Sequence, residues 1–300
     1  MGTINYHSLD GLSDGKKHIL LGSASDRLRK HSEHLVPITD ITSCNEDLTL
    51  DKNGFQHLSE PTSMGHDDWS DRQFVQDHYY PETAAMLKRA TGASDVLYMA
   101  HVIRNATFEE VQKEAKEVEQ REGGDGMVQK MNPARTAHCD QSYKGAEQIL
   151  RIQFDEKRVE EILMKRWAIV NVWRPLKPIH RDPLAVCDWR SISESEDLIG
   201  VDIKLPPPGK HSSLGKAHGV VPAQHMWERW DFKYNPNHKW YYASNMTPDE
   251  CLLLKIFDSK KDGRARCCPH TAFVGERDEG PARESVELRT LVFWDDEGAE

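Results

Sequence analysis

Two short stretches of the sequence place a histidine and an aspartate two residues apart. They are TAHCD, with His138 and Asp140, and PIHRD, with His180 and Asp182. Alternate residues of a β-strand point to the same side, so such a pair can offer two neighbouring ligands to one metal ion. Two histidines and one carboxylate can bind Fe(II) on one face and leave positions open for O₂ and a co-substrate. Either pair therefore needs a second histidine from a distant part of the chain.

The C-terminal part of the sequence supplies this histidine and a carboxylate receptor. His270 lies in CPHTAF, after a predicted strand, and Arg283 and Ser285 form another alternate pair in RESVEL. A planar guanidinium beside a hydroxyl is suited to binding the far carboxylate of a co-substrate such as 2-oxoglutarate. Arg289 lies on the last predicted strand, an even number of positions after Arg283 and Ser285, so its side chain is expected on the same side of the strand. The choice between Arg283 with Ser285 and Arg289 stays open.

The number of predicted strands decides between the two His-x-Asp pairs. A double-stranded β-helix needs four strands between its proximal pair and its distal histidine. Four candidates separate Asp140 from His270, namely 167–176, 184–192, 239–244 and 251–259. Starting at Asp182 leaves three, and the prolines around PIHRDP indicate a loop. We therefore predict that His138, Asp140 and His270 are the metal ligands.

The composition narrows the class of protein. The chain has 300 residues, 38% of them hydrophobic, which is enough for a well-buried core. The net charge of −10 and the lack of a basic stripe argue against nucleic acid or an anionic membrane as a partner. No apolar run has membrane-spanning length and no signal peptide is recognisable, so we expect a cytoplasmic protein. Six cysteines without a CxxC spacing are predicted to be free thiols.

The pattern along the chain predicts a mainly β fold with flanking helices around a double-stranded β-helix (jelly roll) core. Residues 1–65 are expected to form an N-terminal extension packed on this core, and 66–300 a single domain with a loop insertion at about 194–228. Helices are predicted within 66–92, 145–154 and 156–166, and further strands at 94–105 and 284–294. The charged segment 108–126 fits either a solvated helix or a mobile loop.

Several other side chains are candidates for a substrate pocket. Asn171 and Trp173 share one face of the predicted strand 167–176, and Arg174 lies on the other face. A buried Asn or Arg needs a polar partner, so a role in a pocket is one interpretation. Tyr98 and Tyr242 are further candidates. Core packing or a structural ion pair is the alternative for each of them.

The combined motifs resemble the fungal AsaB-like hydroxylase/desaturase family, which includes gibberellin-desaturase-like proteins and is related to the CmcJ proteins. The segments that carry this resemblance are YYPETAAMLKRATGA, ARTAHCDQSYKGA, VNVWRPLK, DPLAVCDWRSI, KWYYASNMTPDECLLLKIFDS, CPHTAF and RESVELRTLVFW. The resemblance implies an oxygenase that depends on Fe(II), 2-oxoglutarate and O₂ and acts in secondary metabolism. It places the metal ligands at His138, Asp140 and His270.

The expected reaction is hydroxylation, desaturation or oxidative ring closure of a small secondary-metabolite or amino-acid-derived substrate. Two alternatives remain: a non-catalytic cupin-like binding protein, and a metal dioxygenase that does not use 2-oxoglutarate. The complete set of ligands argues against the first alternative, and Arg283 with Ser285 argues against the second. We expect a monomer or a homodimer.

Overall fold

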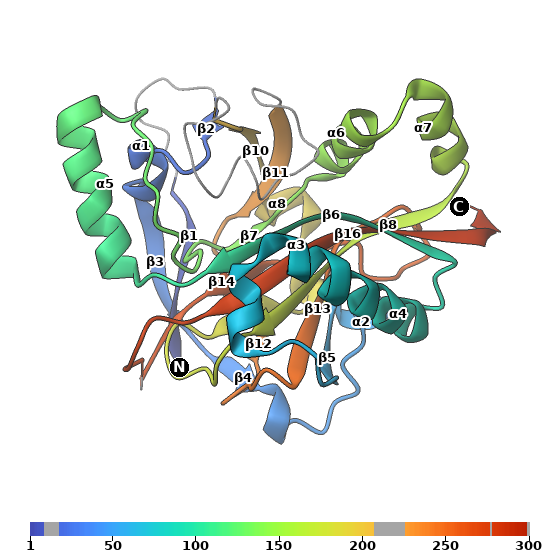
Figure 1. Cartoon of the computed structure of the whole chain (residues 1–300), viewed down its shortest axis with the longest axis horizontal. Helices are drawn as coiled ribbons and strands as arrows, with labels where there is room; N and C mark the ends of the chain where they lie inside the picture. The colour runs from blue at the N-terminus through green and yellow to red at the C-terminus, as the bar shows by residue number, and fades with distance from the viewer. Residues whose placement is uncertain (9–17, 207–225, 277, 299–300) are drawn as a thin grey trace.

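Three β-sheets form the centre of the molecule (Figure 1). The computed structural model describes residues 1–8, 18–206, 226–276 and 278–298. The five-stranded sheet has the order β5 (Phe55–Ser59), β13 (Glu250–Asp258), β8 (Lys165–Pro175), β16 (Ser285–Gly298) and β6 (Asp95–Arg104). The eight-stranded sheet has the order β2 (Ile19–Leu20), β10 (Leu198–Lys204), β11 (Met226–Phe232), β7 (His138–Cys139), β14 (His270–Ala272), β9 (Leu184–Cys187), β12 (Trp240–Tyr242) and β4 (Ile38–Asp40). The small sheet contains β15 (Val274–Gly275), β1 (Gly2–His7) and β3 (His31–Val36).

The five-stranded sheet is buried on both faces, and β8 shows how the sequence achieves this. Its β-branched and aromatic residues favour a strand, and their alternation separates two hydrophobic clusters. Val170 and Val172 pack with Leu87 of helix α4 (Tyr80–Thr91) on the outer face. Ile169 and Trp173 belong to the central core on the opposite face. That inner face is the one turned toward the eight-stranded sheet.

The helices cover the sheets from outside, and the sequence signals for their ends are those observed. Helix α4 starts with a proline in its first turn and stops at Gly92, which has a positive φ. Helix α5 (Phe108–Glu122) begins with a capping box between Thr107 and Glu110. The predicted helices in 66–92, 145–154 and 156–166 are thus confirmed, and of the two alternatives for 108–126 the helix is observed. The remaining helices are α1 (Ala24–Arg27), η1 (Ile41–Ser43), α2 (Leu50–Asn53), η2 (His66–Ser70), α3 (Arg72–Phe74), the π-helix η3 (Val75–Tyr79), α6 (Tyr143–Gln153), α7 (Glu156–Leu163), η4 (Trp189–Ser191) and α8 (Glu194–Asp197).

The predicted loop insertion at 194–228 is wrong for the residues that the structure describes there. Helix α8 is followed by β10, and the segment ends in β11, which pairs with β10 in antiparallel register. The strand signal is the alternation of Val201 and Ile203, which are both buried. The prolines and glycines that follow in the sequence favour a loop, and they led to a loop prediction for the whole segment. Residues 207–225 lie outside the described part of the chain.

The predicted strand 184–192 is correct only in its first half. β9 ends at Cys187, and residues 189–191 form the 3₁₀ helix η4. The side chain of Asp188 accepts a hydrogen bond from the backbone N–H of Arg190 and so starts the turn. Short polar side chains compete with strand pairing in this way.

The first 65 residues supply strands to every sheet. β1 and β3 pair with each other in the small sheet, β2 and β4 occupy the two edges of the eight-stranded sheet, and β5 lies at the edge of the five-stranded sheet. β1 also pairs with β15, which follows β14 in the sequence. The N-terminal residues are therefore hydrogen-bonded into the same framework as the C-terminal ones.

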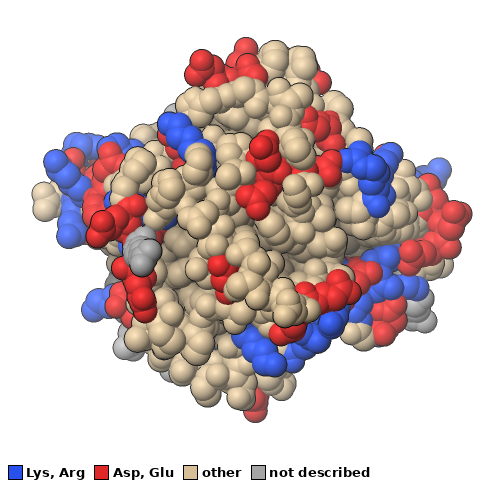
Figure 2. Space-filling view, turned by 90° about the horizontal axis from the view of Figure 1, so that it is seen from below, with Lys and Arg blue, Asp and Glu red and all other residues tan. Residues whose placement is uncertain are grey.

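The six cysteines are free, as predicted, and five of them are buried. None of the helices in the described part of the chain is long and apolar enough to cross a membrane. On the face shown in Figure 2, basic and acidic side chains lie side by side, most clearly along its lower right margin. Charge of the two signs is thus mixed on this surface.

Gly145 allows α6 to pack closely on β11. A Cβ atom at Gly145 would lie 1.8 Å from the carbonyl oxygen of Glu228. We expect Gly145→Ala to lower the free energy of unfolding by about 1–3 kcal/mol, because the helix must move away from the strand. Chemical denaturation measures this change. Gly298→Ala is the matched control, since no heavy atom lies within 4 Å of that position; equal stability of the two variants would contradict the prediction.

Candidate metal centre

The two predicted histidine ligands lie directly opposite each other on neighbouring strands. His138 of β7 pairs in register with His270 of β14, and their ring centroids are 4.6 Å apart. The Nδ1 atom of His138 is 2.7 Å from the carbonyl oxygen of Thr136, and that of His270 is 3.0 Å from the carbonyl oxygen of Cys268. A carbonyl only accepts, so both Nδ1 atoms donate and both Nε2 atoms keep a free lone pair.

Asp140 follows β7 and is held by residues of the facing sheet. Its Oδ2 accepts a hydrogen bond of 2.7 Å from the side-chain amide of Asn171 on β8. Its Oδ1 accepts one of 3.2 Å from Arg289 on β16. The indole N–H of Trp227 donates to the Asp140 carbonyl oxygen at 3.1 Å. The carboxylate is therefore oriented by partners from two strands, β8 and β16, while Trp227 of β11 holds the backbone of Asp140.

His138, Asp140 and His270 form a compact donor set. One ligand atom from each residue lies within 4.8 Å of the others, and all three residues are buried. Two imidazole nitrogens and one carboxylate oxygen are the donor set of a non-haem iron site, so the residues present fit this metal. No other group of His, Cys, Asp and Glu in the described residues is arranged in this way.

The second His-x-Asp pair has a structural role. His180 and Asp182 lie in the loop between β8 and β9, as predicted. Asp182 is fully buried with φ of 51°, and its carboxylate accepts a hydrogen bond of 2.7 Å from Arg135. His180 is exposed. The side chain of Asp182 is thus engaged away from the histidine cluster.

The electrostatics keep Asp140 and His270 in the protonation states that a metal requires. Burial alone would raise the pKa of Asp140, but the positive charge of Arg289 holds it well below its usual range. Burial and the neighbouring His138 lower the pKa of His270. Near neutral pH the carboxyl group is therefore ionised and His270 is neutral, with its lone pair available.

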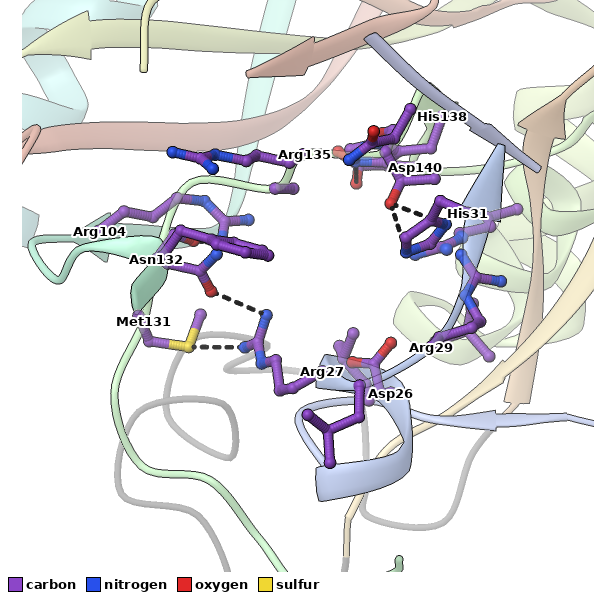
Figure 3. A pocket seen from close by; sticks show the side chains of 18 of the residues that line it. Asp26, Arg27, Arg29, His31, Arg104, Met131, Asn132, Arg135, His138 and Asp140 are labelled. Carbon is purple, nitrogen blue, oxygen red and sulfur yellow. Dashed lines mark hydrogen bonds and ion pairs between the residues drawn. The ribbon is translucent and has the colours of Figure 1, made fainter. Parts of the chain in front are cut away.

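A cavity of about 460 Å³ opens beside the donor set (Figure 3). His138, Asp140 and Arg289 lie on its wall. The opposite side comes from β6, from the segment after α5 and from the N-terminal part of the chain. Figure 3 shows Arg27, Asn132 and Met131 facing the histidine and aspartate across the empty space. A small molecule in this cavity would contact the metal centre.

The two candidates for binding the 2-oxoglutarate carboxylate have different surroundings. Arg289 contacts two carboxylates, Asp140 and Glu287. Arg283 is buried, donates to the carbonyl oxygen of Asp182, and lies with its guanidinium 5.2 Å from the ring centre of Trp173. Its Nε and the hydroxyl of Ser285 are buried atoms without a hydrogen-bond partner in the described residues. Burial lowers the pKa of Arg283 to about 9.

The structure separates the remaining pocket candidates. Asn171 contacts Asp140, and Trp173 lies on the same inner face beside Arg283. Arg174 is on the outer face, where it donates to the hydroxyl of Tyr79 and to two backbone carbonyls. Tyr98 is also on that face, tilted against Tyr80. Tyr242 lines a different pocket, beside Phe273.

Sequence reasoning missed several residues of the cavity wall. They are Arg27, His31, Arg104, Asn132 and Trp227. None of them belongs to a motif, and most lie in segments that were interpreted as an extension or as a loop. Burial and the charge of Arg29 lower the pKa of His31 to about 4, so this wall residue is neutral at physiological pH. Only the folded arrangement reveals these positions.

Comparison with known proteins assigns the chain to a family. A family model described as an oxidoreductase/YMDC permease-like domain matches residues 12–293. The hydroxylase/desaturase efuI of Hormonema carpetanum is 40% identical over 301 residues, which cover 99% of this chain and 96% of that protein. The chain belongs to the fungal hydroxylase/desaturase family. The predicted resemblance and the predicted type of enzyme are thereby confirmed.

Two further relatives carry information on cofactors in their names. The alpha-ketoglutarate-dependent dioxygenase tstK of Talaromyces stipitatus is 30% identical over 270 residues, covering 87% of this chain and 86% of that protein. A variant of the iron and alpha-ketoglutarate-dependent endoperoxidase NvfI has a solved structure that superposes with a TM-score of 0.68 and 25% identity, over 89% of this chain and 88% of that one. A sequence relative is thus named for alpha-ketoglutarate, and a protein of similar structure for both iron and alpha-ketoglutarate.

We expect His270→Ala to weaken binding of Fe(II) at least 100-fold, because one of three protein ligands is lost. Anaerobic equilibrium dialysis at neutral pH measures the affinity. His180→Ala is the matched control, since His180 is exposed in a loop. A similar loss in the two variants, or none in His270→Ala, would contradict the assignment of the ligands.

Asn171→Leu tests the support of Asp140 by the facing sheet. Removing the hydrogen bond to Oδ2 leaves the carboxylate less well oriented, and we expect Fe(II) affinity to fall roughly 10- to 100-fold. The same dialysis experiment provides the readout, and circular dichroism checks that the variant is folded. An unchanged affinity would show that Arg289 alone orients Asp140.

Proposed function

We propose that the chain is an Fe(II)- and 2-oxoglutarate-dependent dioxygenase of the hydroxylase/desaturase type that acts on a small molecule of secondary metabolism. The observation that carries this proposal is the convergence of His138, Asp140 and His270 beside a cavity. Membership in the family, a relative named for alpha-ketoglutarate and a similar structure named for iron and alpha-ketoglutarate support it, and confirm the predicted enzyme class and cofactors. The roles of individual residues are proposals.

The double-stranded β-helix remains the best description of the core. Two sheets face each other and place the donor set between them, with His138 and His270 on one sheet and Asn171 and Arg289 on the other. The proximal pair lies on β7 and the distal histidine on β14. The likeness to the endoperoxidase NvfI, which covers most of the chain, supports this assignment.

Each side chain of the centre has a defined task in the proposed reaction. When bound, Fe(II) with 2-oxoglutarate and O₂ supplies the oxidising power that removes hydrogen from an unactivated C–H bond. His138 and His270 offer neutral nitrogen ligands, because their other ring nitrogens donate to backbone carbonyls. Asp140 adds one negative charge, which Asn171 and Arg289 orient. Because His138 and Asp140 lie on the wall of the cavity, a metal held by this donor set would be accessible to a molecule in it.

We assign the far carboxylate of 2-oxoglutarate to Arg283 and Ser285. A buried cation without a carboxylate partner is costly, and so is a buried hydroxyl without a hydrogen bond. Both conditions are found together here, two residues apart on the strand that leads to Arg289. A carboxylate placed between them would satisfy both groups. Arg289 is the weaker candidate because Asp140 and Glu287 already balance its charge.

The proposed function is tested by the formation of succinate. Purified protein, loaded with Fe(II) and supplied with ascorbate, 2-oxoglutarate and O₂, is expected to convert 2-oxoglutarate slowly to succinate and CO₂ even without a substrate. Under anaerobic conditions 2-oxoglutarate should bind to the iron-loaded protein with a visible charge-transfer absorption band. The proposal is abandoned if neither binding nor succinate is detected while Fe(II) is bound.

Arg283→Leu separates the two carboxylate candidates. We expect the KM for 2-oxoglutarate to rise roughly 10- to 100-fold, since a charge-assisted bidentate contact is lost. Iron affinity should stay within threefold. Arg283→Lys should recover part of the loss, and Arg289→Leu should mainly weaken iron binding through Asp140. The reverse pattern, with the larger KM effect in Arg289→Leu, would transfer the carboxylate site to Arg289.

A further inference from the structure

The cavity is rich in positive charge although the protein as a whole is acidic. Seven of its described wall residues are Lys or Arg and three are Asp or Glu, whereas the whole chain has a net charge of −10. The seven basic residues are Arg27, Arg29, Lys30, Arg104, Arg135, Arg229 and Arg289. A concentration of one sign of charge inside a cleft favours ligands of the other sign.

Most of these cations already form ion pairs with carboxylates of the protein. Arg29 and Arg229 share the buried carboxylate of Asp231, at 3.0 and 2.8 Å. Arg135 is paired with Asp182. Arg289 is paired with Asp140 and Glu287, and Lys30 is exposed. These charges serve the framework or are solvated, so they do not require a ligand.

Arg27 and Arg104 differ, because their hydrogen-bond partners in the described residues are neutral. Arg27 lies 3.5 Å from the side-chain oxygen of Asn132 and 3.5 Å from the sulfur of Met131, and its Nε is buried without a partner. Arg104 donates to the carbonyl oxygen of Asn132 at 2.8 Å. Burial lowers the pKa of Arg104, although the negative charge of Glu287 opposes this effect. Figure 3 shows the two guanidinium groups close to Asn132, on the side of the cavity away from His138 and Asp140.

The rest of the wall suits an apolar molecule. Apolar and aromatic side chains also line the cavity; they include Leu21, Leu28, Val102, Met131, Ile203 and Trp227. Ligand sites commonly combine such a lining with a few polar groups that fix the orientation of the ligand. A molecule anchored at one end by the arginines would therefore present its apolar body to the metal.

We infer that Arg27, assisted by Arg104, binds a carboxylate of the primary substrate and so selects acidic substrates with an apolar body. This inference rests on the proposed function, in which 2-oxoglutarate is held by the metal and Arg283. The site at Arg27 is then free to bind the substrate. Both carboxylates of the co-substrate are then accounted for. The two guanidinium groups on the opposite wall, which form no ion pair within the described residues, provide a separate carboxylate site. The carboxylate end of the substrate is held there while a carbon atom of its body reaches the metal.

The test compares an acid with its neutral isostere. Naphthaleneacetate and naphthaleneacetamide are titrated by anaerobic calorimetry into protein saturated with Fe(II) and 2-oxoglutarate, which occupies the other carboxylate site. We expect the acid to bind at least tenfold more tightly than the amide. In Arg27→Leu this preference should disappear, because a charge-assisted contact is lost. Arg27→Lys should retain part of it, and Lys30→Leu, which removes an exposed charge at the cavity, should change it less than threefold.

The outcomes separate this inference from the proposed function. Equal binding of acid and amide by the parent protein, or a preference that survives in folded Arg27→Leu, would overturn the inference while 2-oxoglutarate still binds. Tighter binding of naphthyl phosphate than of the acid would also overturn the assignment to a carboxylate. If 2-oxoglutarate itself does not bind, the proposed function fails, and the titrations are repeated in Arg283→Leu without co-substrate. In that variant the second arginine that could bind a carboxylate is absent, so a preference for the acid over the amide can be attributed to the site at Arg27.

If Arg27→Leu does not fold, Arg104→Leu and Arg27→Lys replace it. Arg104→Leu is expected to lower the preference for the acid about threefold or more, since it removes the second guanidinium beside Asn132. Thermal unfolding of each variant without ligand serves as the control for folding. If Arg104→Leu and Arg27→Lys both keep the full preference for the acid, the preference comes from the overall charge of the cavity. That result would contradict a specific carboxylate site at Arg27 and Arg104.

Discussion

The position of Asp140 between two sheets is the constraint on which the rest of the structure depends. The carboxylate belongs to the eight-stranded sheet, but the hydrogen bonds that orient it come from Asn171 and Arg289 on the five-stranded sheet. An ionised carboxylate can be buried only when charged or hydrogen-bonding partners accompany it. The two sheets must therefore pack face to face in one relative position. The same relative position of the sheets places the cavity beside the histidines.

The same requirement explains the ion pairs around the cavity. Asp231 is fully buried and contacts His7, Arg29 and Arg229, which come from the N-terminal segment and from β11. This cluster ties the first residues of the chain to the strand beside His138. It also forms ion pairs with two of the cations on the wall, Arg29 and Arg229. Arg27 and Arg104 are left for an incoming anion, so the framework contacts define the polarity of the site as well as its shape.

The metal ligands were accessible to sequence reasoning because their signal is local and chemical. His138 and Asp140 are separated by one residue, and His270 lies in a short motif near the end of the chain. Strands such as β8 and β16 were predicted because β-branched and aromatic residues dominate them. The segment 194–228 was misinterpreted because the weak alternation of β10 precedes a run of prolines and glycines. The counting of four strands between Asp140 and His270 was likewise incomplete, since β10 and β11 also lie there.

By itself, the sequence determined the residue types that can bind a metal, the order in which they occur and the family to which the chain belongs. Tertiary structure decided which side chains surround them. The choice of Asn171 and not Arg174 as a partner of Asp140 follows from the face of β8 that meets the eight-stranded sheet. The contribution of Arg27 follows from the way the N-terminal strands join the sheets. Such contacts link residues far apart in the chain, and their energies depend on burial and on distance, neither of which a local pattern specifies.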